Sequence, residues 1–276
     1  MTDLPLVTLN DSHAIPQIGL GVFQTPNDLA RSVVATALQS GYRHIDTAAA
    51  YQNEEGVGEG IRASGIPRDE IFVTTKVWND DQGYDRTLGS LAASLDRLKL
   101  DHVDLYLIHW PSPQRDLYVQ TWRALIRARE EGLTRSIGVS NFEVEHLDRL
   151  INETGITPAL NQIELHPRFQ QMRLRNANAE RGIRTESWSP LGRGKLLTDP
   201  VIARIARKHG RTPAQVMIRW HLDNALIVIP KSANASRIEE NFGVFGFVLD
   251  ADDLATMRKL DEPGGRIGPN PMTATF

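Results

Sequence analysis

The chain alternates between short apolar runs rich in β-branched residues and longer segments with a helical pattern. We predict strands at 19–23, 44–47, 71–77, 103–109, 136–140, 160–165, 185–188 and 226–230. Helices are predicted between them, at 28–40, 53–64, 84–98, 118–131, 143–152, 171–180 and 213–221. Eight strands separated by helices predict an α/β protein, and they favour a closed parallel (α/β)8 TIM barrel over an open sheet.

Two terminal segments depart from this alternation. Residues 6–16 have alternating apolar positions around an Asn10-Asp11 turn, which predicts a β-hairpin capping the bottom of the barrel. Residues 261–276 are rich in Gly and Pro and have no periodicity, which predicts a C-terminal loop. A frayed tail and a loop that covers the substrate are about equally compatible with this composition.

The length and composition limit the class of protein. The 276 residues suit one barrel, although length alone would equally allow two domains. Because no linker or shift in composition divides the chain, we expect one domain over residues 1–276. The net charge of −3 makes nucleic acid a poor candidate partner.

The N-terminus and the cysteine content indicate the compartment. No basic region followed by an apolar run opens the chain, and no stretch approaches the ~20 apolar residues of a membrane span. The chain has no cysteine, which excludes disulfides and thiolate zinc sites and fits a reducing environment. We therefore expect a soluble, cytoplasmic enzyme without a membrane partner. His109 and His166 are isolated from other ligand types, so no metal site is expected.

Four polar residues stand at or just after the ends of predicted strands: Asp46, Tyr51, Lys76 and His109. In a parallel α/β barrel, the carboxyl ends of the strands meet at one face, where catalytic groups gather. An acid, a phenol, an amine and an imidazole at that face would form a proton-donating site. Taken singly, each also has an ordinary interpretation: a surface tyrosine, a solvated lysine or a structurally satisfied histidine.

A series of short blocks follows in fixed order from the hairpin to about residue 260. They are GYRHIDTA at 41–48, Tyr51 with NEEGVG at 53–58, TTKVW at 74–78, DLYLIHWP at 104–111, SIGVSNF at 136–142, NQIE at 161–164, WSPLG at 188–192 and IPKS at 229–232. In these blocks the chain resembles the aldo-keto reductases, and most of all the prokaryotic branch with the 2,5-diketo-D-gluconic acid reductases. The resemblance implies a single (α/β)8 barrel, a monomer, and NADPH bound without a Rossmann domain. The glycine-containing stretches 56–60 and 192–194 indeed lack the full dinucleotide fingerprint.

Reduction of a carbonyl requires a hydride at carbon and a proton at oxygen. A tyrosine with an ordinary pKa of about 10 donates weakly near neutrality, and a nearby ammonium would lower that pKa. We therefore predict that Tyr51 is the general acid, that Lys76 lowers its pKa, that Asp46 pairs with Lys76, and that His109 orients the substrate carbonyl. The catalytic tetrad of the resembled family falls on these four positions.

A nicotinamide needs an aromatic wall and partners for its carboxamide. Trp188 suits stacking, and Ser140, Asn141 and Gln162 offer suitable donors and acceptors. The resemblance implies these roles. Asn141 could instead cap the following helix, and Trp188 could belong to the barrel core.

Two further segments offer groups for the phosphates of the cofactor. After Trp188 comes a flexible turn whose N–H groups could approach a pyrophosphate: Leu191, Gly192, Arg193 and Gly194. A strand-to-helix junction at 231–241 suits a phosphate, and the resemblance implies that Lys231, Ser232 and Arg237 bind the adenosine 2′-phosphate, with Glu240 and Asn241 near the adenine. Solvated charges at a helix start, and a solvated Arg193, are the ordinary alternatives.

The predicted substrate pocket is aromatic, with Phe23, Trp78 and Trp110 beside His109. Ordinary core packing is the alternative for each ring. The loops at 79–83 and 269–272 are expected to shape the rest of a pocket for a small carbonyl compound: a small aldehyde, an α-dicarbonyl such as methylglyoxal, or a keto-sugar acid. Two other classes stay open, a lyase or aldolase with Lys76 as a Schiff-base amine and a non-catalytic NADPH-binding barrel.

Overall fold

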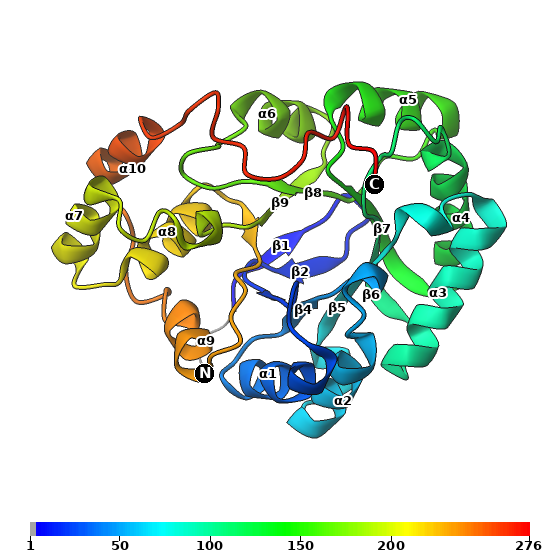
Figure 1. Ribbon diagram of the computed structural model, residues 1–276, viewed down its shortest axis with the longest axis horizontal. Helices are drawn as coiled ribbons and strands as arrows, with labels where there is room; N and C mark the ends of the chain where they lie inside the picture. The colour runs from blue at the N-terminus through cyan, green and yellow to red at the C-terminus, as the bar shows by residue number, and fades with distance from the viewer. Residues whose placement is uncertain (1–3) are drawn as a thin grey trace.

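The structure, a computed structural model, describes residues 4–276. Its main sheet has eight parallel strands, and each strand lies beside its neighbours in sequence from β3 to β10 (Figure 1). The strands are β3 (Leu20–Gly21), β4 (His44–Asp46), β5 (Phe72–Val77), β6 (Val103–Ile108), β7 (Thr134–Ser140), β8 (Leu160–Glu164), β9 (Arg184–Trp188) and β10 (Ile227–Val228). All eight predicted strands are present, and their ends shift by no more than a few residues.

Backbone pairing between the first and last strands closes the sheet. Ile18 forms a parallel bridge with Val228, and Gly21 forms one with Lys231. The Gly21 amide also donates to the backbone oxygen of Pro230 at 3.2 Å. The predicted (α/β)8 barrel is therefore confirmed.

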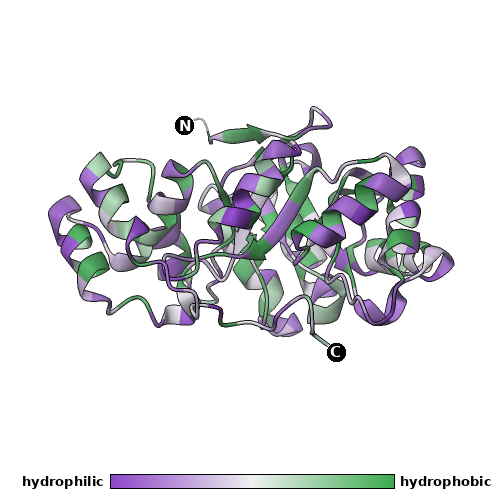
Figure 2. Cartoon of the chain, turned by 90° about the horizontal axis from the view of Figure 1, so that it is seen from above, coloured by the Kyte–Doolittle hydropathy of each residue, from purple (hydrophilic) through white to green (hydrophobic). Residues whose placement is uncertain are grey.

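The N-terminal hairpin covers one end of the barrel. Strands β1 (Leu6–Thr8) and β2 (Ala14–Pro16) pair antiparallel. Leu9 and Ile15 are buried against side chains from inside the barrel, namely Phe72, Leu105, Leu107, Leu160 and Ile227. In Figure 2 the hairpin lies on one face of the molecule and the C-terminus on the opposite face. The predicted cap on the barrel bottom is confirmed.

Helices surround the sheet. They are α1 (Asn27–Gln39), α2 (Glu54–Ser64), α3 (Tyr84–Leu98), α4 (Tyr118–Glu130), α5 (Val144–Thr154), α6 (Met172–Glu180), α7 (Pro200–His209), α8 (Pro213–Asp223), α9 (Ala235–Phe242) and α10 (Ala251–Arg258). The seven predicted helices are confirmed, and α9 follows the predicted strand-to-helix junction at 231–241, whereas α7 and α10 were missed. Sequence signals for both exist, because Asp199 caps α7 ahead of a proline and Asp250 forms a capping box at α10. No helix within residues 4–276 is long and apolar enough to cross a membrane.

Candidate active site

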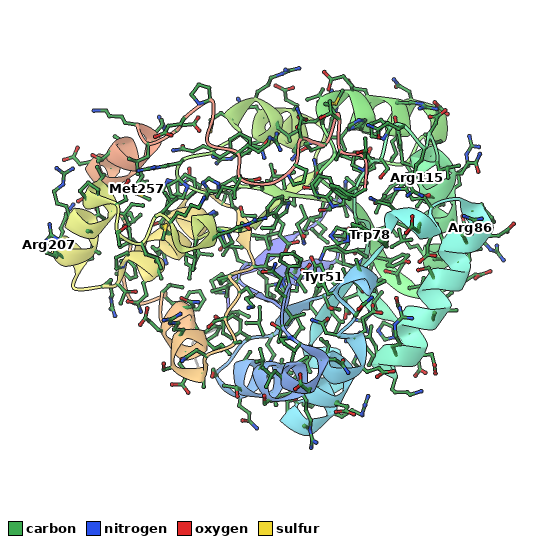
Figure 3. The ribbon with its side chains drawn as sticks, in the orientation of Figure 1. Tyr51, Trp78, Arg86, Arg115, Arg207 and Met257 are labelled. Atoms are coloured by element: carbon green, nitrogen blue, oxygen red, sulfur yellow. The ribbon has the colours of Figure 1, made fainter. Side chains whose placement is uncertain are left out.

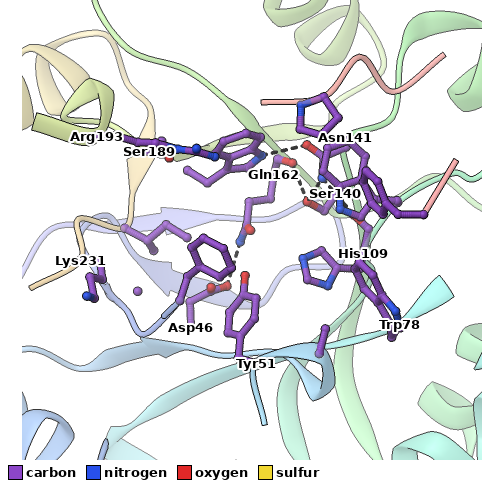
Figure 4. Close-up of a pocket in the computed structure, with 18 of the residues that line it drawn as sticks. Asp46, Tyr51, Trp78, His109, Ser140, Asn141, Gln162, Ser189, Arg193 and Lys231 are labelled. Atoms are coloured by element: carbon purple, nitrogen blue, oxygen red, sulfur yellow. Dashed lines mark hydrogen bonds between the residues drawn. The ribbon is translucent and has the colours of Figure 1, made fainter. Parts of the chain in front are cut away.

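A cavity of about 640 Å³ opens at the carboxyl ends of the barrel strands (Figure 4). Its lining includes most of the predicted site residues: Phe23, Asp46, Tyr51, Trp78, His109, Trp110, Ser140, Asn141, Gln162, Trp188, Arg193 and Lys231. Lys76 is fully buried and does not line the cavity. Figure 3 shows Tyr51 and Trp78 near the middle of this face, whereas Arg86 and Arg207 lie at the periphery.

Lys76 and Asp46 form a buried ion pair. Lys76 Nζ donates to Asp46 Oδ1 at 2.7 Å and to the backbone oxygen of Thr47 at 2.8 Å. Burial by itself would lower the pKa of Lys76, but Asp46 and Tyr51 together raise it above its ordinary value. Lys76 is therefore an ammonium held in one place.

Tyr51 ends the short 3-10 helix η1 (Ala49–Tyr51) that follows β4. Its ring centroid lies 5.1 Å from Lys76 Nζ, 5.1 Å from the Phe23 ring and 5.6 Å from the His109 ring. Burial raises the pKa of Tyr51, and Lys76 opposes that effect. The lowering expected from Lys76 is present, but desolvation outweighs it, so the pKa of the phenol stays above its ordinary value.

His109 directly follows β6 and lines the cavity, with its ring edge-on to Trp78 at 5.1 Å between centroids. Burial and the charge of Lys76 hold the pKa of His109 well below its ordinary value. The imidazole is therefore neutral near pH 7. Its Nδ1 has no hydrogen-bond partner among residues 4–276, so the ring keeps unused hydrogen-bonding capacity.

Asn141, Ser140 and Trp188 form a hydrogen-bonded group beside these residues. Trp188 Nε1 donates to Asn141 Oδ1 at 2.8 Å, and Asn141 Nδ2 donates to the backbone oxygen of His109 at 2.9 Å. Ser140 Oγ donates to the backbone oxygen of Gln162 at 2.8 Å. Asn141 does not cap the next helix, because the N-cap of α5 is Glu143. Trp188 is half-buried and lines the cavity.

The turn after β9 contains the 3-10 helix η4 (Gly192–Gly194). Arg193 and Gly194 both have left-handed backbones, with φ of 52° and 83°. Arg193 is exposed at the rim of the cavity, whereas Leu191 packs against the core. Together with the exposed Lys231, Arg193 gives the rim a positive charge.

The junction before α9 contributes unequally to the cavity. Lys231 lines it, but Ser232, Arg237, Glu240 and Asn241 do not. Ser232 Oγ accepts from the backbone N–H of Asn234 at 3.1 Å, and Arg237 is exposed in the first turn of α9. Glu240 is engaged elsewhere, since its carboxylate accepts from Thr212 Oγ1 at 2.8 Å, and Asn241 is buried.

The C-terminal segment packs against the cavity rather than fraying. Glu164 accepts hydrogen bonds from the backbone N–H groups of Ile267 at 2.6 Å and Gly268 at 2.7 Å. Farther on, Phe276 stacks on Trp78 at 5.8 Å and meets Trp110 edge-on at 5.0 Å. The segment therefore completes the aromatic wall.

A family model supplies the deciding comparison. The model of the aldo/keto reductase family matches residues 17–262, which is most of the chain. The chain belongs to the aldo/keto reductase family. This confirms the resemblance derived from the sequence blocks.

Individual relatives agree with this assignment. An aldo-keto reductase of Mycolicibacterium smegmatis is 57% identical to this reductase over 272 residues, covering 99% of this chain and 98% of the relative. Methylglyoxal reductase DkgA of Escherichia coli is 51% identical over 273 residues, covering 98% of each. The crystal structure of a Gox0644 mutant in complex with NADPH is 53% identical, has a TM-score of 0.96 and covers 99% of each chain.

Sequence reasoning missed several residues around the cavity of this reductase. Phe276 lies far along the chain from Trp78 and Trp110, and no local pattern signals their contact. Gln52 and Ser189 also line the cavity. Gln52 directly follows Tyr51 in the sequence, and Ser189 directly follows Trp188. Glu186, buried beneath the cavity, was missed as well. Its signal was an acid in the middle of a predicted strand.

Proposed function

We propose that this reductase reduces aldehydes or ketones to alcohols with NADPH, and that Tyr51 supplies the proton. The position of Tyr51 carries the proposal: its ring lies beside the Lys76 ammonium and the neutral His109, in a cavity also lined by Asn141 and Trp188. Proton donor and cofactor groups thus share one cavity.

Each tetrad member has a separate task. When bound, NADPH supplies the hydride that reaches the carbonyl carbon. Tyr51 donates its phenolic proton to the carbonyl oxygen, where negative charge develops. Tyr51 is protonated near neutrality even at its ordinary pKa of about 10, and burial raises that pKa further. Lys76 opposes the rise, because its ammonium stabilises the phenolate that remains. Asp46 fixes Lys76, and neutral His109 donates a hydrogen bond that orients the carbonyl.

The residues beside the tetrad fit a nicotinamide. Trp188 offers an aromatic face, while Ser140, Asn141 and Gln162 have both donors and acceptors for a primary amide. The backbone of the turn at Leu191, Gly192, Arg193 and Gly194 suits a pyrophosphate, because left-handed residues there can present N–H groups to an anion. The NADPH complex of the related Gox0644 mutant supports this choice of cofactor.

Lys231, Ser232 and Arg237 are the groups we assign to the adenosine 2′-phosphate, at the start of α9. An exposed ammonium, a hydroxyl and an exposed guanidinium near a helix N-terminus suit a dianion. Glu240 and Asn241 are weaker partners for the adenine, because Glu240 already accepts from Thr212 and Asn241 is buried.

Small carbonyl compounds suit the cavity best. Phe23, Trp78, Trp110 and Phe276 supply apolar walls, which bury the carbon skeleton of a substrate and exclude water. The name of the E. coli relative, a methylglyoxal reductase, supports α-dicarbonyls as a first choice. Small aldehydes and keto-sugar acids are further candidates.

The environment of Lys76 disfavours a Schiff-base lyase. A Schiff base needs a neutral amine that reaches the substrate. Lys76 is instead fully buried, donates to Asp46 and Thr47, and has a raised pKa.

We also propose that the chain works as a single domain and as a cytoplasmic monomer. The barrel spans the sequence from β3 to β10, and residues 17–262 match one family model. The net charge of −3 disfavours nucleic acid as a partner.

A substrate panel tests the proposed activity. NADPH absorbance is followed with aldehydes, α-dicarbonyls and keto-sugars side by side, using the wild type, Tyr51→Phe and Tyr84→Phe. Tyr51→Phe should lose about 10²–10⁴-fold in kcat, the range for a general acid, with NADPH affinity nearly unchanged. Tyr84, an exposed tyrosine at the start of α3, serves as the control and should not affect turnover.

Two results would contradict the proposal. Undiminished turnover in Tyr51→Phe would remove Tyr51 as the proton donor. A wild type that binds NADPH but does not oxidise it with any carbonyl compound of the panel would instead favour a non-catalytic barrel.

A further inference from the structure

Glu186 is a fully buried acid that the proposed chemistry leaves without a role. It lies on β9, in register with Gln162 of β8. It does not line the cavity, so it cannot touch a substrate there. Its position inside the barrel nevertheless places it next to the tetrad.

One amide nitrogen joins Glu186 to Asp46. Gln162 Nε2 donates to Glu186 Oε2 at 2.6 Å and to Asp46 Oδ2 at 2.8 Å. Figure 4 draws the bond from Gln162 to Asp46 beside the Tyr51 ring. Because Lys76 binds the other oxygen of Asp46, a continuous chain runs from Glu186 to Lys76.

The charges in this chain do not balance if every acid is ionised. Lys76 contributes one positive charge, whereas Asp46 and Glu186 would contribute two negative ones, all fully or almost fully buried. An uncompensated charge in such a place is expensive, so a proton must reside on one of the groups. Two other titratable residues lie near these three groups, Tyr51 and His44. The Nδ1 of His44 is 3.8 Å from Glu186 Oε1.

Burial raises the pKa of both acids, but of the two Lys76 donates a hydrogen bond only to Asp46 and favours its ionised form. Glu186 is therefore the group that holds this proton. Burial, reinforced by Asp46, raises the pKa of Glu186 to about 8. Burial and Lys76 lower the pKa of His44 to about 3, so His44 is neutral and cannot serve as the counter-ion. The Nδ1 of His44 and the Oε1 of Glu186 make no hydrogen bond within the described part of the chain, so no contact with His44 fixes the charge of Glu186.

We propose that Glu186 is a positioning residue of this reductase: protonated, it anchors Gln162 and keeps the buried charge around Lys76 balanced, and its ionisation in alkali weakens Tyr51 as a proton donor. This inference rests on the proposed role of Tyr51. A negative charge on Glu186 raises the pKa of Tyr51 and that of Lys76. Tyr51 then gives up its proton less readily, so reduction slows as the pH rises through the range where Glu186 ionises.

The variant Glu186→Gln tests the proposal, because glutamine has the same shape, still accepts from Gln162 and stays neutral at every pH. The kcat for carbonyl reduction is measured from about pH 6 to about pH 9.5. We expect the two proteins to agree within about twofold near pH 6.5. Above about pH 8 the wild type should lose activity several-fold more than the variant.

Unfolding provides a readout that does not depend on catalysis. The carboxyl of Glu186 has an ordinary pKa of 4.5 and a native pKa of about 8, so the native state binds more protons between these values. The free energy of unfolding of the wild type should therefore fall as the pH rises from about 4.5 to about 8. Glu186→Gln should remove much of that slope in urea titrations.

Two further variants separate charge from structure. Glu186→Met is neutral, but its thioether accepts only a weak hydrogen bond from Gln162. Its kcat near pH 6.5 should therefore be lower than that of the wild type, without a further loss of kcat above about pH 8. Glu54→Gln removes another buried acid, one paired with Arg97, and should keep the wild-type pH profile.

Three outcomes would overturn the inference. One is an equal alkaline loss in the wild type and Glu186→Gln. The second is a kcat of Glu186→Gln that is reduced at every pH while its pH profile keeps the wild-type shape, which would indicate a purely structural role. The third is an unfolding free energy whose slope with pH is the same in both proteins. A failed reductase activity in the wild type would leave this last measurement intact, so the two hypotheses fail separately.

Discussion

Tyr51 illustrates what decides the behaviour of a single residue. Its position and its neighbours Lys76 and His109 could be predicted from sequence blocks, but the direction of its net pKa shift could not. The Lys76 ammonium lowers the pKa of Tyr51 from 5.1 Å away, whereas the desolvation that raises it depends on how Phe23 and the cavity walls pack around the ring. Burial prevails, so the phenol of Tyr51 is protonated near neutrality.

Arg237 is the residue that should discriminate between the two nicotinamide cofactors. Arg237→Ala should weaken NADPH binding by about tenfold or more, the value of one charge-assisted contact of about 1.5–3 kcal/mol. NADH lacks the 2′-phosphate and should be affected little. Fluorescence titration with both cofactors measures the difference. Arg207→Ala, at the periphery of the molecule, is the control, and equal losses for NADPH and NADH would remove the assignment.

Helix α2 shows how packing overrides propensity at the scale of an element. Glycines disfavour helices, yet α2 contains three of them. A Cβ at Gly56 would overlap the backbone oxygen of Asn27, and one at Gly58 would overlap that of Leu98. The stretch 56–60 that lacks the Rossmann fingerprint is therefore a contact surface that lets α2 approach α1 and the end of α3.

The same substitution should have opposite effects in two neighbouring helices. Gly58→Ala should destabilise the protein by about 1–3 kcal/mol, because the methyl group meets rigid backbone. Gly89→Ala in α3 has open space and should stabilise it by about 0.5–1 kcal/mol. Urea denaturation measures both. Stabilisation by Gly58→Ala would show that α2 is not held as closely as described.

In the whole molecule, the residues that close the barrel core and the residues that line the cavity lie at opposite ends of the barrel. The hairpin of β1 and β2 closes one end with Leu9 and Ile15, and the cavity opens at the other. Such a division is usual in parallel barrels, where the amino-terminal face serves stability. The C-terminal segment adds Phe276 to the chemical end.

Mutations in the hairpin should therefore change stability without changing catalysis. Ile15→Ala should cost about 2–5 kcal/mol, since Ile15 is fully buried at the barrel floor. Leu6→Ala, on the same hairpin but 62% exposed, should stay within about 0.5 kcal/mol of wild type. For both variants and the wild type, the free energy of unfolding is measured by urea denaturation, and the KM is measured for a reducible carbonyl compound. A raised KM in folded Ile15→Ala would contradict the separation.

Local patterns determined much of this protein. Periodicity and strand-end residues predicted the eight strands, the capping hairpin and the position of all four tetrad residues, because these features depend on neighbours close in sequence. The helices α7 and α10 were missed although their capping residues were visible.

Contacts between distant residues were decided only by the tertiary structure. Phe276 meets Trp78 across almost two hundred positions, with Asn79 Nδ2 donating to its backbone oxygen. Glu186 of β9 becomes a neutral acid only because β8, β4 and β5 bring Gln162, Asp46 and Lys76 around it and exclude water. Desolvation and long-range packing are properties of the closed barrel, and no local pattern encodes them.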